Sequence, residues 1–232
     1  MAEVGAQDKP QTLYANFWVY KADRDWRKLA SADKAAARAE FAQILERHAA
    51  EGIDVRGVYS MVGLRHDADL ITWIVARDVE SMQRLAVALN ASTLGAYLDT
   101  VHSFLGVALG TRYTADHAPA FVKGIPPKRY LSVYPFVKTH EWYQLPFEER
   151  RQTMAEHGKM GREYPDILTN TVSSFGVGDH EFVVAFESDD VPDMVRMVEH
   201  LRPAASRPYT KLDTPILLGV LKDPIAALED LG

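Results

Sequence analysis

The chain has 232 residues, of which 47% are hydrophobic and 25% are charged, the balance of an ordinary soluble globular protein. The net charge of −6 and the scattered lysines and arginines exclude the bulk electrostatic footprint of a nucleic-acid-binding protein, and the lack of cysteine excludes disulfides and thiolate metal sites. No apolar run is long enough to span a membrane, and the first residues lack the order of a signal peptide, so we expect a cytoplasmic protein.

The first half of the chain predicts six elements in the order β-α-β-β-α-β. Its strands are rich in aromatic and β-branched residues, and its first helix has Phe41, Ile44 and Leu45 on one face at helical spacing. The six elements cover residues 12–22, 31–52, 55–63, 69–78, 79–92 and 102–110. Residues 1–10, which precede them, are expected to be disordered.

The second half repeats this order, which is that of the ferredoxin-like motif, with helices on one face of an antiparallel sheet. We therefore predict an α+β fold of two ferredoxin-like repeats, at residues 11–112 and 129–232, joined by a loop-like linker at residues 113–128 and packed sheet against sheet. The elements of the second repeat cover residues 129–138, 145–158, 167–178, 180–189, 189–202 and 215–223.

His157 lies on the same face of its predicted helix as Phe147 and Met154, where a core-facing helix should have an apolar residue. Because an unpaired buried polar group is costly, the imidazole needs a partner. The negative end of the helix or a backbone carbonyl could be that partner, which would make the histidine structural. The nearby Gly158 and Gly161 would instead let a flat ligand approach the backbone, and a neutral imidazole is a common ligand of haem iron.

Alternation along residues 129–138 places Tyr134 and Lys138 on one face of a strand, and this face is aromatic and polar. The face could simply be exposed to solvent, but a tyrosine and a lysine facing a cavity would suit an acidic aromatic ligand. Pro135 cannot donate to a strand ladder, which favours an edge or a bulge at this point. Further along, Arg202 and Arg207 could interact with a helix dipole or clamp a carboxylate.

Four stretches of the second half resemble the coproheme decarboxylases of the chlorite-dismutase-like superfamily. They are YPFVK, WYQLPFEERRQTMAEHGKMGREY, GVGDHEF and LRPAASRPYTKLDTPILLG. In combination these motifs are specific, whereas the first half matches the family only in the order of its elements. The resemblance implies that the two repeats form a dimeric α+β barrel within one chain and that the chains assemble into a homopentamer.

The resemblance also implies a reaction in haem biosynthesis. Iron coproporphyrin III (coproheme), both substrate and redox cofactor, is converted into haem b by hydrogen-peroxide-dependent oxidative removal of two propionates as carbon dioxide. The expected partners are therefore coproheme and hydrogen peroxide, together with the ferrochelatase that supplies coproheme, and no nucleic acid.

Matched motif by motif, the resemblance makes His157 the proximal iron ligand, Tyr134 the catalytic residue that forms a radical and attacks a propionate, and Lys138 a propionate contact. Arg202 and Ser206 match an arginine and a serine of the closing segment, so we expect both to bind substrate.

The chain departs from many members of the family at two places. They have an arginine in the linker and a glutamine in the strand after the proximal histidine, where this chain has Ala120 and Asn170. His117 lies close to the first place. The chain thus resembles the branch with a distal histidine, in which His117 would be the catalytic base for peroxide and Asn170 would contact substrate. An isolated loop histidine that is merely solvated is the alternative for His117.

Other functions fit the same fold. A chlorite dismutase or a haem peroxidase would use the same iron site, although chlorite dismutation would favour a distal arginine that neither residues 134–138 nor residues 167–174 supply. A haem carrier would bind the porphyrin without turnover, and a cofactor-free protein with this barrel would not bind it.

Overall fold

The structure of the protein is a computed structural model that describes residues 12–109 and 118–232. The first repeat has the predicted order of elements, and β4 begins earlier than expected, at Leu98. Its strands are β1 (Leu13–Ala22), β2 (Asp54–Ser60), β3 (Leu70–Ala76) and β4 (Leu98–Ala108). Its helices are α1 (Ser31–Ala50) and α2 (Val79–Asn90), with the 3₁₀ helices η1 (Arg24–Lys28) and η2 (Gly95–Tyr97).

The second repeat follows the same plan with several short additions. Its strands are β5 (Tyr130–Lys138), β6 (Leu168–Thr169), β7 (Val172–Ser173), β8 (Phe182–Ser188), β9 (Thr210–Leu212) and β10 (Leu217–Lys222). Its helices are α3 (His140–Gln144), α4 (Phe147–Gly161), α5 (Val191–His200) and α6 (Pro224–Glu229), with the 3₁₀ helix η3 (Arg207–Tyr209). The sequence patterns did not predict α3, β9, α6 or the three 3₁₀ helices.

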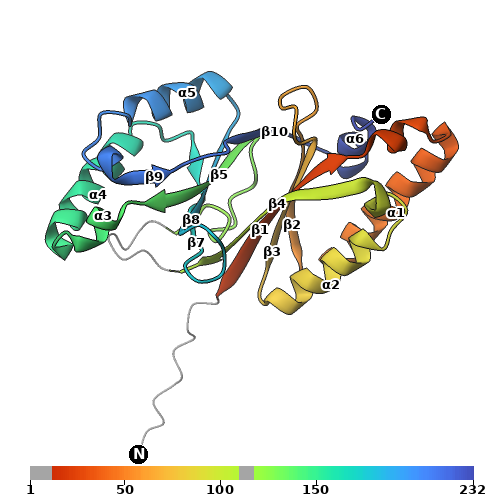
Figure 1. Cartoon of the computed structure of the whole chain (residues 1–232), viewed down its shortest axis with the longest axis horizontal. Coiled ribbons are helices and arrows are strands. Elements are labelled where there is room, and N and C mark those ends of the chain that lie inside the picture. The colour runs from red at the N-terminus through yellow and green to blue at the C-terminus, as the bar shows by residue number, and fades with distance from the viewer. Residues whose placement is uncertain (1–11, 110–117) are drawn as a thin grey trace, which may run out of the picture.

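Within the described residues, ten strands form one antiparallel sheet in the order β6-β8-β7-β4-β1-β3-β2-β10-β5-β9. A further pairing of β8 with β5 closes eight of them into a barrel and leaves β6 and β9 at its margin. Figure 1 shows α1 and α2 on one side of the strands, with α4 and α5 on the opposite side. The predicted fold class, two ferredoxin-like repeats packed as one α+β barrel, is therefore confirmed.

The barrel interior is a core shared by both repeats. Phe17 and Trp73 come from the first repeat, Val133 and Val183 come from the second, and all four are fully buried. A second core lies between the outer face of the first repeat and its helices, where α1 and α2 bury Phe41, Leu45, Leu85 and other apolar side chains. β1 and β3 contribute side chains to both cores, because successive side chains of a strand point to opposite faces of the sheet.

The second repeat is packed differently on its outer face. None of the residues of α4 is buried, although the helix is 15 residues long. The outward residues of β5 and β8, among them Tyr134, Phe136, Val184 and Phe186, are only half-buried. The small cluster of Ile167, Met194 and Met197 under α5 is the buried core on this side. The helices of the second repeat therefore leave part of an aromatic sheet face uncovered.

The predicted strand over residues 167–178 is wrong in its extent, because the structure divides it into β6 and β7 around Asn170. The Asn170 side chain binds Phe121 N and Glu187, and the chain turns sharply after Ser174, whose carbonyl accepts hydrogen bonds from Val177 N and Gly178 N. Side-chain partners from distant segments thus override local strand propensity here. No described helix is long and apolar enough to cross a membrane.

Candidate functional site

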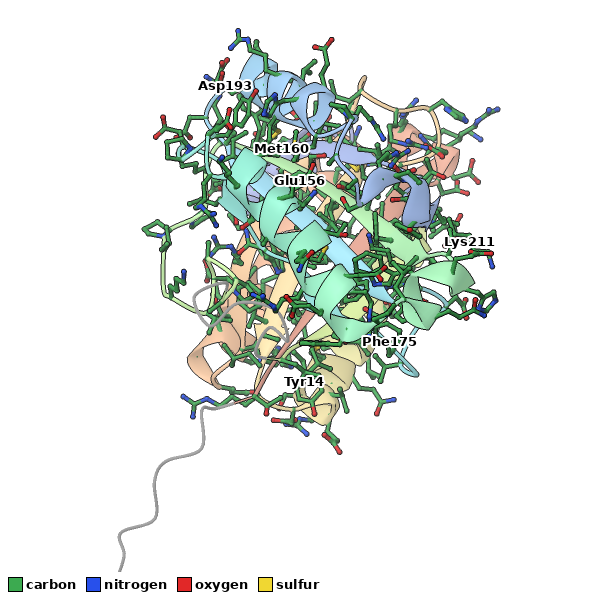
Figure 2. The ribbon with its side chains drawn as sticks, turned by 90° about the vertical axis from the view of Figure 1, so that its left-hand side faces the viewer. Tyr14, Glu156, Met160, Phe175, Asp193 and Lys211 are labelled. Carbon is green, nitrogen blue, oxygen red and sulfur yellow. The ribbon has the colours of Figure 1, made fainter. Side chains whose placement is uncertain are left out.

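Helix α4 and the outward face of the second repeat's sheet enclose the candidate site. The half-buried residues of α4 form one stripe that faces inwards and has few large apolar side chains; they are Arg150, Thr153, Met154, His157, Gly158, Met160 and Gly161. Figure 2 shows α4 in front of the strands of this repeat, with Met160 and Glu156 labelled beside it and Phe175 near its N-terminal end. A helix that lies over a half-buried aromatic face without burying a residue of its own suits a flat ligand between the two layers.

His157 lies on the inward stripe of α4 and contacts Ser206, which comes from the segment after α5. Its Nδ1 atom is 3.3 Å from Ser206 Oγ, and Ser206 is only 5% exposed. A metal-binding histidine usually has its second ring nitrogen held by a neighbour, which fixes the ring orientation and the tautomer. The contact with Ser206 has this form, so the structure fits a role for His157 in holding iron.

Tyr134 lies on the outward face of β5, within range of the charges of Arg202, Arg207 and Asp213. Asp213 accepts a hydrogen bond of 3.4 Å from Arg202 Nη1 and a shorter one from Arg207 Nη1. Burial raises the pKa of Tyr134 well above its ordinary value, and the charge of Asp213 adds to this rise, while the two arginines oppose it. The phenol therefore keeps its hydrogen at neutral pH.

The carboxyl of Asp213 has opposing influences on its pKa. Burial acts to raise the pKa, but the hydrogen bonds and positive charges of Arg207 and Arg202 outweigh burial, so the net pKa is lowered. Asp213 is therefore ionised at neutral pH and partly neutralises the arginine pair. The pair remains available to an incoming anion, because the Arg202 and Arg207 side chains are 45% and 38% exposed.

Lys138 ends β5 and is 9% exposed. Its ammonium lies 4.4 Å from the ring centre of Trp142 and 5.3 Å from that of Phe136, and donates a long hydrogen bond of 3.5 Å to Ser206 O. Burial lowers the pKa of Lys138 to about 8, with Arg207 adding to the fall and Glu181 opposing it. A desolvated ammonium beside aromatic rings is prepared to receive a carboxylate.

The local structure of β5 explains how these side chains come to the site. β5 pairs with β10 over Tyr130–Val133 and with β9 at Val137 and Lys138, with a register shift between the last two residues. Pro135 lies between these two pairings, as its missing N–H predicts, but β5 is not an edge strand, because β8 pairs with it along Tyr130–Phe136. Lys138, which follows the register shift, is buried beside Phe136 of the outward face.

Asn170 lies apart from these residues. It is 0% exposed, its Nδ2 donates to Glu187 Oε1 at 2.9 Å, and its Oδ1 accepts from Phe121 N at 3.0 Å. Glu187 is also 0% exposed and accepts from Nε and Nη2 of Arg56 and from Lys128 N. The structure thus uses both polar atoms of the Asn170 side chain in a buried network that fastens the linker to the barrel, and this gives no support to a substrate contact.

The structure thus brings together five of the predicted site residues from three separate segments: Tyr134, Lys138, His157, Arg202 and Ser206. His117 lies outside the described residues, so its role as a base stays a prediction. Sequence reasoning missed Asp213 and Trp142. Both residues belong to motifs that carry the resemblance, so an acidic and an aromatic residue could have been noticed there. Only the fold shows that Asp213 lies beside Arg207 and that Trp142 lies beside Lys138.

The arrangement can bind a flat, acidic, iron-containing aromatic ligand. An imidazole held by Ser206 comes from α4, and an aromatic sheet face with a neutral phenol lies on the other side. Arg202 and Arg207 act on the phenol, and Lys138 lies at the end of the same strand, close enough to Arg207 to be affected by its charge. The residues therefore fit an iron porphyrin with carboxylate side chains, with His157 as the residue that would hold the iron.

Comparisons with known proteins agree with this site. The family model named chlorite dismutase matches residues 34–222. The coproheme decarboxylase of Mycolicibacterium smegmatis is 38% identical over 188 residues, which are 81% of this chain and 81% of that protein. The solved chlorite dismutase of Candidatus Nitrospira defluvii in complex with imidazole has a TM-score of 0.85 at 25% identity, and the match covers 94% of each chain. A variant of the same protein has a TM-score of 0.86 at 26% identity, covering 94% of this chain and 95% of that one.

The family model spans most of the chain, and the relative from M. smegmatis matches it over about four fifths of both lengths. The protein belongs to the chlorite dismutase family.

Proposed function

We propose that this protein is a coproheme decarboxylase, which forms haem b from iron coproporphyrin III with hydrogen peroxide as oxidant. The observation that carries this proposal is the position of Tyr134, a neutral phenol beside the cations Arg202 and Arg207 on the sheet face that lies under α4. A phenol that can give up a hydrogen atom next to a carboxylate-binding group suits oxidative decarboxylation. The 38% identity to a coproheme decarboxylase supports the same reaction.

In this proposal the iron porphyrin, when bound, supplies the redox chemistry, and the protein positions it. His157 holds the iron, and Ser206 Oγ orients the imidazole through Nδ1. Lys138, Arg202 and Ser206 bind carboxylates of the porphyrin. Positioning dominates the protein's contribution, because a reacting group must lie close to the bond that breaks.

Tyr134 would act as the hydrogen-atom relay. Its raised pKa keeps the oxygen protonated, so that the phenol can lose a hydrogen atom and become a neutral radical. The radical would take a hydrogen atom from the β-carbon of a propionate held beside it, which restores the phenol. Loss of one further electron would release the carboxylate as carbon dioxide and leave a vinyl group, so each propionate would consume one hydrogen peroxide as a two-electron oxidant. His117 would act as the base for hydrogen peroxide, as the resemblance to the distal-histidine branch implies.

Three further expectations belong to this proposal. They are assembly as a homopentamer, a cytoplasmic location, and supply of coproheme by a ferrochelatase. All three rest on the resemblance or on composition.

The direct test is to load the protein with coproheme, titrate it with hydrogen peroxide and follow the porphyrin by mass spectrometry. We expect stepwise loss of two carboxyl groups and accumulation of haem b. Porphyrin that binds but keeps its mass would make the protein a haem carrier, and bleaching without haem b would indicate a peroxidase. Release of dioxygen from chlorite would instead favour the activity named for the solved relative.

A further inference from the structure

Arg150 shares the inward stripe of α4 with His157. The two residues are seven positions apart, which is close to two helical turns, so they lie on the same face about 10 Å apart along the axis. Arg150 is half-buried, as His157 is. A long basic side chain at this place reaches the outer part of any flat ligand whose centre lies under His157.

The guanidinium of Arg150 has no anionic partner among the residues that the structure describes. Its Nε atom is buried and has no hydrogen-bond partner, and none of the ion pairs in the described ranges includes it. Its guanidinium carbon lies 5.8 Å from the ring centre of Phe147. A buried N–H of a charged group without an acceptor is costly and is rare in native proteins.

The next residue along the helix shows the contrast. Arg151 is exposed and donates to both carboxylate oxygens of Glu148 at 2.8 and 2.6 Å, as expected for a pair on a helix surface. Two consecutive arginines therefore have different environments, one satisfied on the surface and one unsatisfied on the inward stripe. This difference indicates a ligand for Arg150 and not a general need for positive charge on α4.

We propose that Arg150 binds a carboxylate of the porphyrin. This inference rests on the proposed function and extends it. Iron coproporphyrin III has four propionates, whereas haem b has two. Arg150 adds a carboxylate site to those of Lys138 and the arginine pair, so the protein favours a porphyrin with more carboxylates over one with fewer.

The test measures binding of iron-free coproporphyrin III by fluorescence, which needs neither iron nor turnover. We expect Arg150→Gln to raise the Kd by roughly tenfold or more, the effect of losing one charge-assisted hydrogen bond. Arg151→Gln is the matched control and should stay within about twofold of wild type. The tetramethyl ester of coproporphyrin III, which has no free carboxylate, should bind equally to all three proteins.

Arg150→Lys keeps the charge and should recover much of the lost affinity, which separates a binding role from a folding defect. Circular dichroism and urea unfolding of both variants show that the fold is retained. A Kd for Arg150→Gln within about twofold of wild type, with normal binding by the wild-type protein, would overturn this inference alone. Failure of the wild-type protein to bind coproporphyrin III would overturn the proposed function and this inference with it.

Discussion

Ser206 Oγ lies 3.3 Å from Nδ1 of His157, and this contact joins α4 to the segment that follows α5. Nδ1 is therefore the ring nitrogen that is turned towards Ser206. An imidazole held through Nδ1 presents Nε2 from the opposite side of the ring. The carbonyl of the same serine accepts a hydrogen bond from Lys138 Nζ, so one residue contacts both the proposed iron ligand and a proposed carboxylate contact.

His157→Ala should remove the iron ligand and leave the porphyrin's carboxylate contacts in place. We expect the visible spectrum of bound ferric coproheme to change, because the axial ligand sets the electronic state of the iron. The Kd for iron-free coproporphyrin III should stay within about threefold of wild type. An unchanged iron spectrum in this variant would show that another residue binds the iron.

Tyr134→Phe should abolish decarboxylation and preserve the fold and coproheme binding. The change removes one hydroxyl and keeps the ring that packs at 6.0 Å against Phe186. A phenyl ring cannot readily give up a hydrogen atom, so peroxide should bleach the porphyrin or leave it as coproheme. Mass spectrometry of single-turnover samples measures the outcome. Haem b formed at a rate near that of wild type would exclude a radical on Tyr134.

Affinity for coproporphyrin III should fall as pH rises above about 8, the pKa of Lys138. Below this pH the ammonium is charged and attracts a carboxylate; above it the free protein loses that charge, and binding must then take up a proton. The Kd should rise by up to about tenfold per pH unit until the pKa of the bound form is reached. Fluorescence titrations between pH 7 and pH 9.5 measure this dependence.

Lys138→Met is the informative variant for this titration, and Lys211→Met is its control, because Lys211 is an exposed lysine of β9. The first change should weaken binding at pH 7 and flatten the pH dependence. The second should leave both unchanged. A Lys138→Met protein with the same pH profile as wild type would assign the titration to another group.

Glu187→Gln should destabilise the protein by about 3–5 kcal/mol, because it leaves the buried Arg56 guanidinium without its counter-charge. The Arg56 side chain is 5% exposed and that of Glu187 is 0% exposed. The double variant Arg56→Met, Glu187→Leu should lose less stability than the single change, since no unpaired charge remains. Urea unfolding measures both. A single variant as stable as wild type would mean that water reaches the network.

The order of elements was predictable because its signals are local. The apolar, β-branched strand β3 and the apolar stripe of α1 can each be read from a short stretch of sequence, and the structure confirms both. α3, β9 and α6 are too short to give a periodic signal, and they form through contacts with other segments. The break at Asn170 depends on Glu187, which is 17 positions away in the sequence.

The site was predictable to the extent that its residues belong to motifs. Tyr134, Lys138 and His157 could be selected from the sequence, but the sequence could not show that Ser206 meets both Lys138 and His157. Asn170 was selected in the same way, but its side chain lies in a buried hydrogen-bond network. A motif match gives the position of a residue in the chain and not the direction of its side chain. The environment of Arg150 depends on tertiary packing alone.

The two repeats differ in what stabilises their helices. α1 buries Phe41 and Leu45, and each such side chain contributes about 1.5–3 kcal/mol, whereas α4 buries none of its residues. Under the proposed function, the porphyrin supplies the missing buried surface. The amides of α4 should then exchange with solvent readily in the free protein and slowly in the loaded one. Proteases that cut transiently opened segments would remove the empty enzyme first, so the cellular abundance of the protein would follow the supply of its own substrate.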